Sequence, residues 1–517
     1  MFVVARSSRY SRSITKRFKS ISAAAVLQTP VRNHRDVFSS LSDVDPNGEY
    51  TPSELIIKKR QGGKLSFAEL EWFVHGFNNG TVTDYHMSAF LMAVCIRGMT
   101  NEEATSLTLA MVRTGRQVIL DGVQPTKPKV DHQSTGGVGD KVSLILTPLI
   151  ACFDVVVPQF SCRGLGHTGG LLDKIESIPG VSANVSTEQY IRLLDQVGCS
   201  VVAPSSDFVP VGEGIRSLRD VCGAVDNVAL VASSIMSKKL AERPDSLFLD
   251  VKMGSGAFCS NLHDAASLAS MMVSIGEQAG IDTVCMITNN DQPIGSMVGN
   301  WLEVKEAIDV MKGGSSSYKF ASEVRETCIA QASVMLGLAG KADSFAQGCE
   351  KAESMLDSGA ALLKFAEMVE AQGGNKDMIL NPEEHNLGEV LKLVHLAHDD
   401  MVVQNVDAYN IGVGSMRLGA GRMYAQGPID GQAGIELHAK TGSVVKRGDP
   451  IFTAFVGAGE IIGLDSPQVR LRNGFQKGVD AFKLIQNAPN NWVPVPPSNI
   501  EYFVDRNGLV PFKCLKK

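Results

Sequence analysis

Two glycine-rich segments and one cationic helical segment contain the residue types that bind anions and polar heterocycles. The first reads Ser134-Thr135-Gly136-Gly137-Val138-Gly139-Asp140 and precedes the apolar stretch 142–152. Its glycines let the backbone approach an anion closely, and the N-terminus of a following helix offers free N–H groups. The spacing fits neither a Walker A loop nor a dinucleotide fingerprint. We therefore expect this segment to bind phosphate; the alternative is that it only forms a tight structural turn.

The second glycine-rich segment spans residues 161–170 and reads Ser-Cys-Arg-Gly-Leu-Gly-His-Thr-Gly-Gly. If it follows the next strand, the two loops lie at neighbouring strand ends and are able to surround one small ligand. We interpret His167 as a hydrogen-bonded structural histidine, because no acidic partner for a general base is evident.

The cationic segment contains Ser234 and Lys238, which are four residues apart in an expected helix and so share one face. Together with Arg219 they are suited to hydrogen-bond the carbonyls of a planar imide and to stabilise negative charge on it. The alternative is that Lys238 and Lys239 form a solvated face near the helix end.

The elements that position these segments follow from capping signals and periodicity. Three capping boxes predict helices in the first part of the chain, namely Thr51 with Glu54, Ser66 with Glu69, and Thr100 with Glu103. Beyond residue 125, short apolar runs alternate with helical stretches, which predicts an α/β fold with a mostly parallel central sheet. We expect a small helical domain in two parts (50–120 and 212–242), a large α/β domain (125–205 and 245–375) and a C-terminal α+β portion (376–517).

Composition excludes several classes of function. A formal net charge of -6 argues against a surface built to neutralise nucleic acid. The ten cysteines include no C-x-x-C pair, so no zinc ribbon and no other metal site is expected. No apolar run reaches the roughly 18 residues of a membrane span.

The first 35 residues are rich in arginine and serine and contain no acidic residue. This is typical of a mitochondrial transit peptide. Residues 1–45 are therefore expected to be a transit peptide or disordered leader. A basic tail on a cytoplasmic protein and a plastid address are the alternatives.

Four segments together carry a resemblance to a known family: 134–140, 163–170, 172–180 and 250–258. In order and spacing they are similar to signatures of the thymidine and pyrimidine-nucleoside phosphorylases. The resemblance runs from about Ile56 to about Val456. It implies a nucleoside phosphorylase/phosphoribosyltransferase-like fold, a homodimer, and reversible cleavage of a pyrimidine nucleoside by inorganic phosphate. Phosphate would be a co-substrate, and no cofactor is expected.

The resemblance also assigns roles to individual residues. Arg219 and Lys238 would be catalytic, and they would bind the base together with Ser234. The apolar positions around the nucleoside would be Leu165, Val225, Val231 and Phe258. The phosphate-binding positions would be Ser134, Gly136, Gly137, Ser143, Ser161 and His132.

Four positions depart from the family pattern. His132 stands where the family has a lysine, and Gln133 where it has a histidine. Leu171 replaces a threonine and Arg216 a tyrosine. Our first hypothesis is a phosphorylase with an altered phosphate site. The alternatives are a catalytically impaired relative, acting as a pyrimidine-binding or structural protein in a mitochondrial assembly, and a related transferase that uses a phosphorylated sugar.

Overall fold

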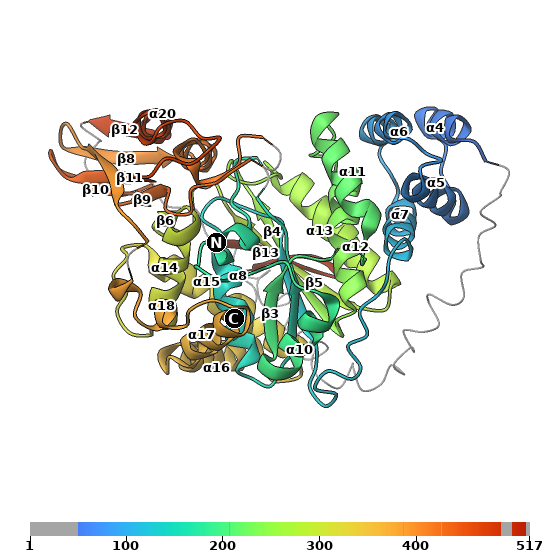
Figure 1. The fold of residues 1–517 in the computed structure, drawn as a ribbon, viewed down its shortest axis with the longest axis horizontal. Coiled ribbons are helices and arrows are strands. Elements are labelled where there is room, and N and C mark those ends of the chain that lie inside the picture. Colours follow the sequence, from blue (N-terminus) through green and yellow to red (C-terminus); the bar gives the residue numbers. More distant parts are fainter. Residues whose placement is uncertain are drawn as a thin grey trace, which may run out of the picture.

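Three parts lie side by side in the computed structural model: a helical domain, a central α/β domain and a C-terminal portion of short strands (Figure 1). The structure describes residues 50–164, 166–205, 207–385, 387–424, 427–486 and 499–512. The expected leader at residues 1–45 and the expected base-site residue Leu165 lie outside the described residues.

Two separate stretches of sequence build the helical domain. Its helices are α4 (Pro52–Arg60), α5 (Phe67–Asn79), α6 (Asp84–Arg97), α7 (Asn101–Arg113), α11 (Pro210–Val221) and α12 (Val228–Glu242). The three predicted capping boxes are confirmed, since each hydroxyl and each glutamate satisfies a backbone N–H of its helix start. Buried residues of both stretches, such as Phe73 and Ile215, share one core cluster. Apolar packing therefore joins α11 and α12 to helices about a hundred residues earlier.

A mostly parallel sheet forms the centre of the α/β domain, as predicted. Strands β1 (Val130–Ser134), β4 (Ser246–Met253) and β5 (Asp282–Asn289) pair in parallel. Beside them, β2 (Val157–Phe160) and β3 (Cys199–Val202) form a parallel pair. The helices that accompany these strands are α8 (Val142–Ala151), α9 (Leu171–Ile175), α10 (Thr187–Val197), α13 (Leu262–Gln278), α14 (Asn300–Met311), α15 (Ala321–Leu338), α16 (Phe345–Asp357), α17 (Ala360–Ala371), α18 (Asp377–Leu380) and the 3-10 helix η1 (Pro382–Glu384).

Helices cover both faces of this sheet, and the strand sequence shows why. Along β4, Phe248 belongs to the core cluster that contains α8 and α15, whereas Leu247 and Leu249 belong to the cluster of α12 and α13. Successive residues of a strand point to opposite faces, so a continuous apolar run is what a doubly covered strand requires. The carboxyl ends of β1, β2 and β4 are then left to carry polar loops.

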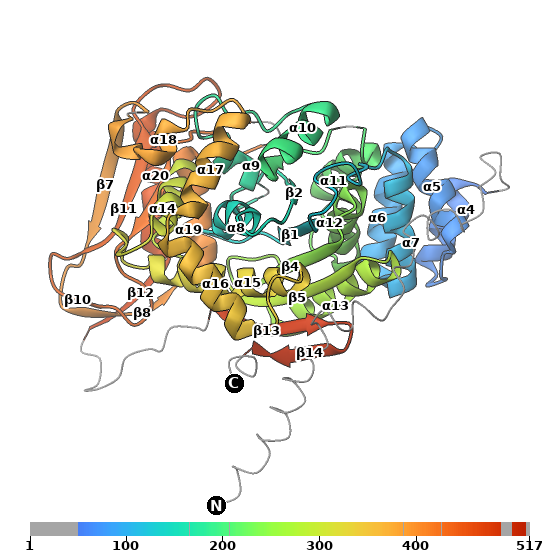
Figure 2. The same cartoon turned by 90° about the horizontal axis from the view of Figure 1, so that it is seen from below.

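The C-terminal portion differs from the expected 376–517 at both ends. Strand β6 (Met297–Val298) comes from the α/β part of the chain but pairs with β9 (Gly434–Leu437). Conversely, β13 (Ile500–Asp505) pairs antiparallel with β5, and β14 (Gly508–Pro511) follows it at the sheet edge (Figure 2). The central sheet is thus completed by residues from the end of the chain.

In the described residues, two antiparallel sheets, two α-helices and one π-helix make up the rest of this portion. The sheet orders are β6-β9-β11-β7 and β10-β8-β12. The remaining elements are β7 (Val390–Leu396), β8 (Met401–Val406), α19 (Ala408–Ser415), the π-helix η2 (Met416–Ala420), β10 (Val444–Val445), β11 (Pro450–Gly457), α20 (Pro467–Asp480) and β12 (Phe482–Gln486). No helix in the described ranges is long and apolar enough to cross a membrane.

Candidate active site

A cavity of about 160 Å3 lies where the ends of β1 and β2 face helices α11 and α12. Both glycine-rich segments and the cationic helical segment contribute to its wall. The predicted site residues that line it are Ser134, Gly136, Ser143, Ser161, Arg219, Val225, Val231, Ser234, Lys238 and Phe258. Two predicted residues, His132 and Gly137, are not among the lining residues.

The hydroxyl and N–H end of the cavity is formed by the first glycine-rich segment and the start of α8. Ser134 Oγ accepts a hydrogen bond from the N–H of Gly136 at 3.1 Å and donates one to Asp140. Gly136 has a φ of 97°, which favours glycine over any residue with a side chain. Ser143 and Ser161 are buried in the same wall. This end therefore offers several neutral hydrogen-bond groups.

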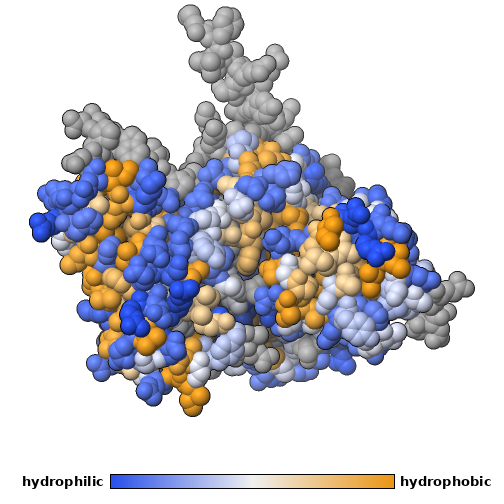
Figure 3. Space-filling model, turned by 90° about the horizontal axis from the view of Figure 1, so that it is seen from above, coloured by the Kyte–Doolittle hydropathy of each residue, from blue (hydrophilic) through white to orange (hydrophobic). Residues whose placement is uncertain are grey.

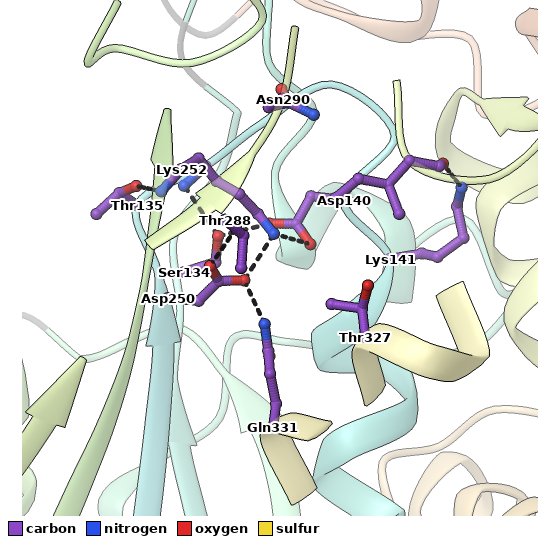
Figure 4. Close-up of polar contacts among 12 residues, drawn as sticks. Ser134, Thr135, Asp140, Lys141, Asp250, Lys252, Thr288, Asn290, Thr327 and Gln331 are labelled. Atoms are coloured by element: carbon purple, nitrogen blue, oxygen red, sulfur yellow. Dashed lines mark hydrogen bonds and ion pairs between the residues drawn. The ribbon is translucent and has the colours of Figure 1, made fainter. Parts of the chain in front are cut away.

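A buried network of charges supports Ser134 from behind (Figure 4). Lys252 Nζ lies 2.6 Å from Asp250 Oδ2 and 3.7 Å from Asp140 Oδ1. Asp250 also accepts hydrogen bonds from Thr288 and Gln331. Asp250 and Lys252 lie on β4, Thr288 on β5 and Gln331 on α15, so the network ties the first glycine-rich segment to these three elements.

Charge in this network is balanced within the protein. Burial by itself raises the pKa of Asp140, but Lys252 and Lys174 outweigh it and hold the pKa below its usual range. Lys174 Nζ in turn pairs with Glu303 at 2.8 Å and donates to the Asp140 carbonyl at 2.6 Å. Lys252 and Lys174 are thus committed to protein carboxylates, and an anion beside Ser134 would meet mainly hydroxyl and N–H donors.

His132 requires a correction of the expected phosphate-binding set. Its imidazole is buried, and Nε2 lies 3.0 Å from Thr147 Oγ1 of α8. Burial lowers the pKa of His132 to about 4, so the ring is neutral at neutral pH. Gly137 faces Asn290 and Lys252 rather than the cavity. The physical reason in both cases is that helix α8 and the network of Figure 4 cover these positions.

The other three departures from the family pattern do line the cavity. Gln133 turns its side-chain amide onto the Ser134 carbonyl at 2.7 Å. Leu171 presents an apolar surface at the start of α9. Arg216 forms a two-pronged ion pair with Glu213, with Nε at 2.9 Å from Oε2. The pKa of Glu213, which burial alone would raise, is lowered by this pair.

The Arg219 side chain mainly makes hydrogen bonds to the backbone of the cavity wall. Its guanidinium donates to the carbonyls of Ala224, Val225 and Leu230, at 3.1, 2.5 and 3.2 Å. Burial lowers the pKa of Arg219 to about 10, so it stays charged at neutral pH. The arginine therefore shapes the loop between α11 and α12 and keeps a cation against the cavity.

Ser234 and Lys238 lie one turn apart on α12, and both face the cavity as the helical spacing predicted. Lys238 Nζ donates a hydrogen bond to Cys162 Sγ at 3.0 Å. Lys239 points the other way and pairs with Asp131 at 2.6 Å. The interpretation of His167 as a hydrogen-bonded structural residue is confirmed, because Nε2 lies 3.1 Å from the Gly256 carbonyl.

The cavity is also lined by residues that had been given no role from the sequence, among them Asp140, Cys162 and Lys174. These three lie inside or beside the segments that carry the family resemblance. Asp140 follows a glycine and Cys162 follows a serine, which is a signal that could have found these two, but the contacts of all three depend on elements distant in sequence.

Three family models match consecutive parts of the chain. Residues 53–115 match the glycosyl transferase family, helical bundle domain, and residues 126–362 match the glycosyl transferase family, a/b domain. Residues 402–460 match the pyrimidine nucleoside phosphorylase C-terminal domain.

Several relatives match most of the chain in sequence. The pyrimidine-nucleoside phosphorylase of Bacillus subtilis is 40% identical over 403 residues, which is 78% of this chain and 91% of the relative. The chain belongs to the pyrimidine-nucleoside phosphorylase family. The family member from Geobacillus stearothermophilus is equally similar, at 40% over 403 residues. These findings give no support to the alternative of a component of a mitochondrial assembly.

The fold of this family member is also found in a solved structure. Anthranilate phosphoribosyltransferase from Thermus thermophilus matches with a TM-score of 0.50 and 17% identity, over 62% of this chain and 99% of that one. At this identity the likeness shows the fold alone. It agrees with the predicted combination of a helical bundle and an α/β domain.

Proposed function

We propose that the protein catalyses reversible phosphorolysis of a pyrimidine nucleoside, giving the free base and a pentose 1-phosphate. The observation that carries this proposal is the pairing of Ser234 and Lys238 on one wall of the cavity with the hydroxyls of Ser134 and Ser161 on another. Membership of the family and the activity for which its relatives are named support the choice of substrate.

In this mechanism the two ends of the cavity have different tasks. A phosphate oxygen attacks C1 of the pentose while the C1–N bond to the pyrimidine breaks, and the bonding electron pair stays on the ring nitrogen. Lys238 and the nearby Arg219 stabilise the negative charge that develops on the departing base. Ser134, Ser143, Ser161 and the Gly136 N–H hold phosphate in line with C1. We propose no cofactor besides phosphate as co-substrate.

We expect this protein to bind phosphate more weakly than proteins that keep the family pattern at these positions. A hydrogen bond to a charged group contributes about 1.5–3 kcal/mol. His132 is neutral and Leu171 has no hydroxyl, so two such contacts are missing. We therefore expect an active enzyme with weak phosphate binding.

Phosphate-dependent release of uracil or thymine from uridine or thymidine by the purified full-length chain tests this function. Lys238→Ala should lower kcat/KM about a hundredfold or more, because it removes a donor used in the transition state. The matched control Lys477→Ala changes a half-buried lysine of α20 that does not line the cavity, and it should leave the rate unchanged. Release that does not need phosphate, or an unaffected Lys238→Ala variant, would refute the proposal.

We further propose a homodimer. Helix α6 exposes Tyr85 by 70% and Ile96 by 72%, with Met92 between them on the same helix. Figure 3 shows apolar surface on the side of the helical domain. Exposed apolar patches of this kind mark contact surfaces, and family membership supports a second copy as the occupant.

We also propose that residues 1–45 direct import into mitochondria. The basic, serine-rich composition of this segment supports this location. Fusing residues 1–45 to a fluorescent protein tests it: mitochondrial fluorescence is expected, and diffuse cytoplasmic fluorescence would contradict the proposal.

A further inference from the structure

The contact between Cys162 and Lys238 joins two walls of the cavity. Cys162 lies two residues after the end of β2, and Lys238 lies on α12. Their Sγ and Nζ atoms are 3.0 Å apart, and both residues line the cavity. Within the described residues, Sγ is the only hydrogen-bond partner of the Lys238 ammonium, which leaves two N–H groups for a ligand.

The neighbouring lysine shows that this arrangement is particular to Lys238. Lys239 Nζ contacts Asp131, Glu242 and the Phe160 carbonyl, so all its donors are used inside the protein. Lys238 has one sulfur contact and faces open space. A lysine side chain has four rotatable bonds, so a single anchor near its tip strongly restricts where the ammonium lies.

We propose that Cys162 is a positioning residue that holds the Lys238 ammonium at the base end of the cavity. The proposal rests on the proposed function, in which Lys238 stabilises the departing pyrimidine. With Sγ as one partner, the remaining N–H groups of Lys238 are available to a ligand in the cavity, which Ser234 also lines from one turn earlier on α12. The ammonium is then in place before the base becomes negatively charged.

The electrostatic surroundings favour an ionic form of the contact. Burial by itself raises the pKa of the Cys162 thiol, but Lys238, Arg216 and Lys239 outweigh burial and lower the pKa below its ordinary value. Arg216 is balanced by Glu213, and Lys239 by Asp131 and Glu242. Among these described cations, Lys238 is therefore the one without a carboxylate partner. It should have the largest effect on the pKa of the Cys162 thiol.

Alkylation of Cys162 tests the contact independently of turnover. Iodoacetamide reacts with the thiolate, which forms an S–C bond as iodide leaves, and peptide mass spectrometry reports the rate at each cysteine. Cys152 is a matched internal control, because it is also half-buried and burial raises its pKa to about 11. At pH 7, Cys162 should react faster than Cys152. Lys238→Met should slow Cys162 about tenfold or more and leave Cys152 unchanged.

Kinetics of two Cys162 variants test the positioning role. Cys162→Ala should lower kcat of phosphorolysis about tenfold while KM for the nucleoside changes less than about twofold, because the anchor acts in the transition state. Cys162→Ser keeps an acceptor for the ammonium and should restore most of kcat. A merely structural cysteine would not give this division between kcat and KM together with rescue by serine.

The outcomes separate this inference from the function on which it rests. Equal alkylation rates of Cys162 in the wild type and Lys238→Met would overturn the contact, and a wild-type kcat in Cys162→Ala would overturn its role. Absence of any phosphate-dependent release by the wild type would refute the proposed function. The positioning role would then fall with the function, whereas the alkylation rates of Cys162 in the wild type and Lys238→Met would still test the contact, because they do not depend on turnover.

Discussion

At the scale of single residues, we expect Leu171 to limit how strongly the proposed phosphate end of the cavity binds its anion. Leu171→Thr should lower KM for phosphate about tenfold or more, since one added hydrogen bond to a charged group contributes about 1.5–3 kcal/mol. Leu171→Val is the matched control, because valine has the shape of threonine without the hydroxyl. Equal phosphate KM values for the threonine and valine variants would show that position 171 does not contact phosphate.

His132 should make stability depend on pH. Its folded pKa of about 4 lies below the ordinary 6.5, so the unfolded chain binds the proton more tightly. The contribution of neutral His132 to the free energy of unfolding is fully present above about pH 6.5 and is lost as the pH falls toward 4. Between about pH 7.5 and 5, this loss amounts to about 2 kcal/mol. His132→Gln should reduce the fall in unfolding free energy by that amount, as measured by urea denaturation at both pH values; an unchanged fall would contradict the pKa.

The sequence predicted correctly which side chains face the cavity where spacing along one helix decides this. It failed where a side chain is covered by another element. Ser234 and Lys238 reach the cavity together because they are four apart on one helix. His132 shares strand β1 with Ser134, but it lies two residues earlier, where Thr147 of α8 covers its side chain. A family motif gives the position of a residue in the chain but not what covers its side chain.

At the scale of elements, the turn from β1 into α8 depends on a backbone held against Asn290. Asn290 Oδ1 accepts from the Val138 N–H at 2.8 Å, and Nδ2 donates to the Val138 carbonyl at 3.1 Å. A Cβ at Gly137 would lie 2.8 Å from Asn290 Oδ1. Gly137 is therefore required for close approach rather than for contact with phosphate.

Gly137→Ala should lower the free energy of unfolding by about 1–3 kcal/mol, because the methyl group overpacks this contact. It should also raise KM for phosphate by displacing the loop. Gly337→Ala in α15 is the control: a Cβ there meets nothing within 4 Å, and alanine favours the helix. Equal urea midpoints for Gly137→Ala and the wild type would contradict the steric argument.

Helices and the parallel strands could be predicted, but the pairing of distant segments could not. Capping boxes are local, so the starts of α4, α5 and α7 were evident from a few residues. Nothing near residue 500 indicates that β13 completes the sheet beside β5. Strand pairing depends on which edge is free in the folded domain.

At the scale of the whole molecule, the apolar face of α6 should control assembly. Ile96→Glu places a charge within the proposed contact and should convert the dimer into a monomer, as measured by light scattering coupled to size-exclusion chromatography. Glu102→Gln, a change on exposed polar surface, is the control and should leave the mass unchanged. A monomeric wild type, or a dimeric Ile96→Glu variant, would show that α6 is not the interface.

The sequence alone determined the family, the fold class and the segments that meet at the cavity, because these depend on motif order, capping and periodicity. Tertiary structure decided which side chains face the open space. It placed Cys162 against Lys238, paired the buried lysines with carboxylates, and closed His132 beneath α8. The physical reason is that burial and charge balance arise between elements that are far apart in the chain.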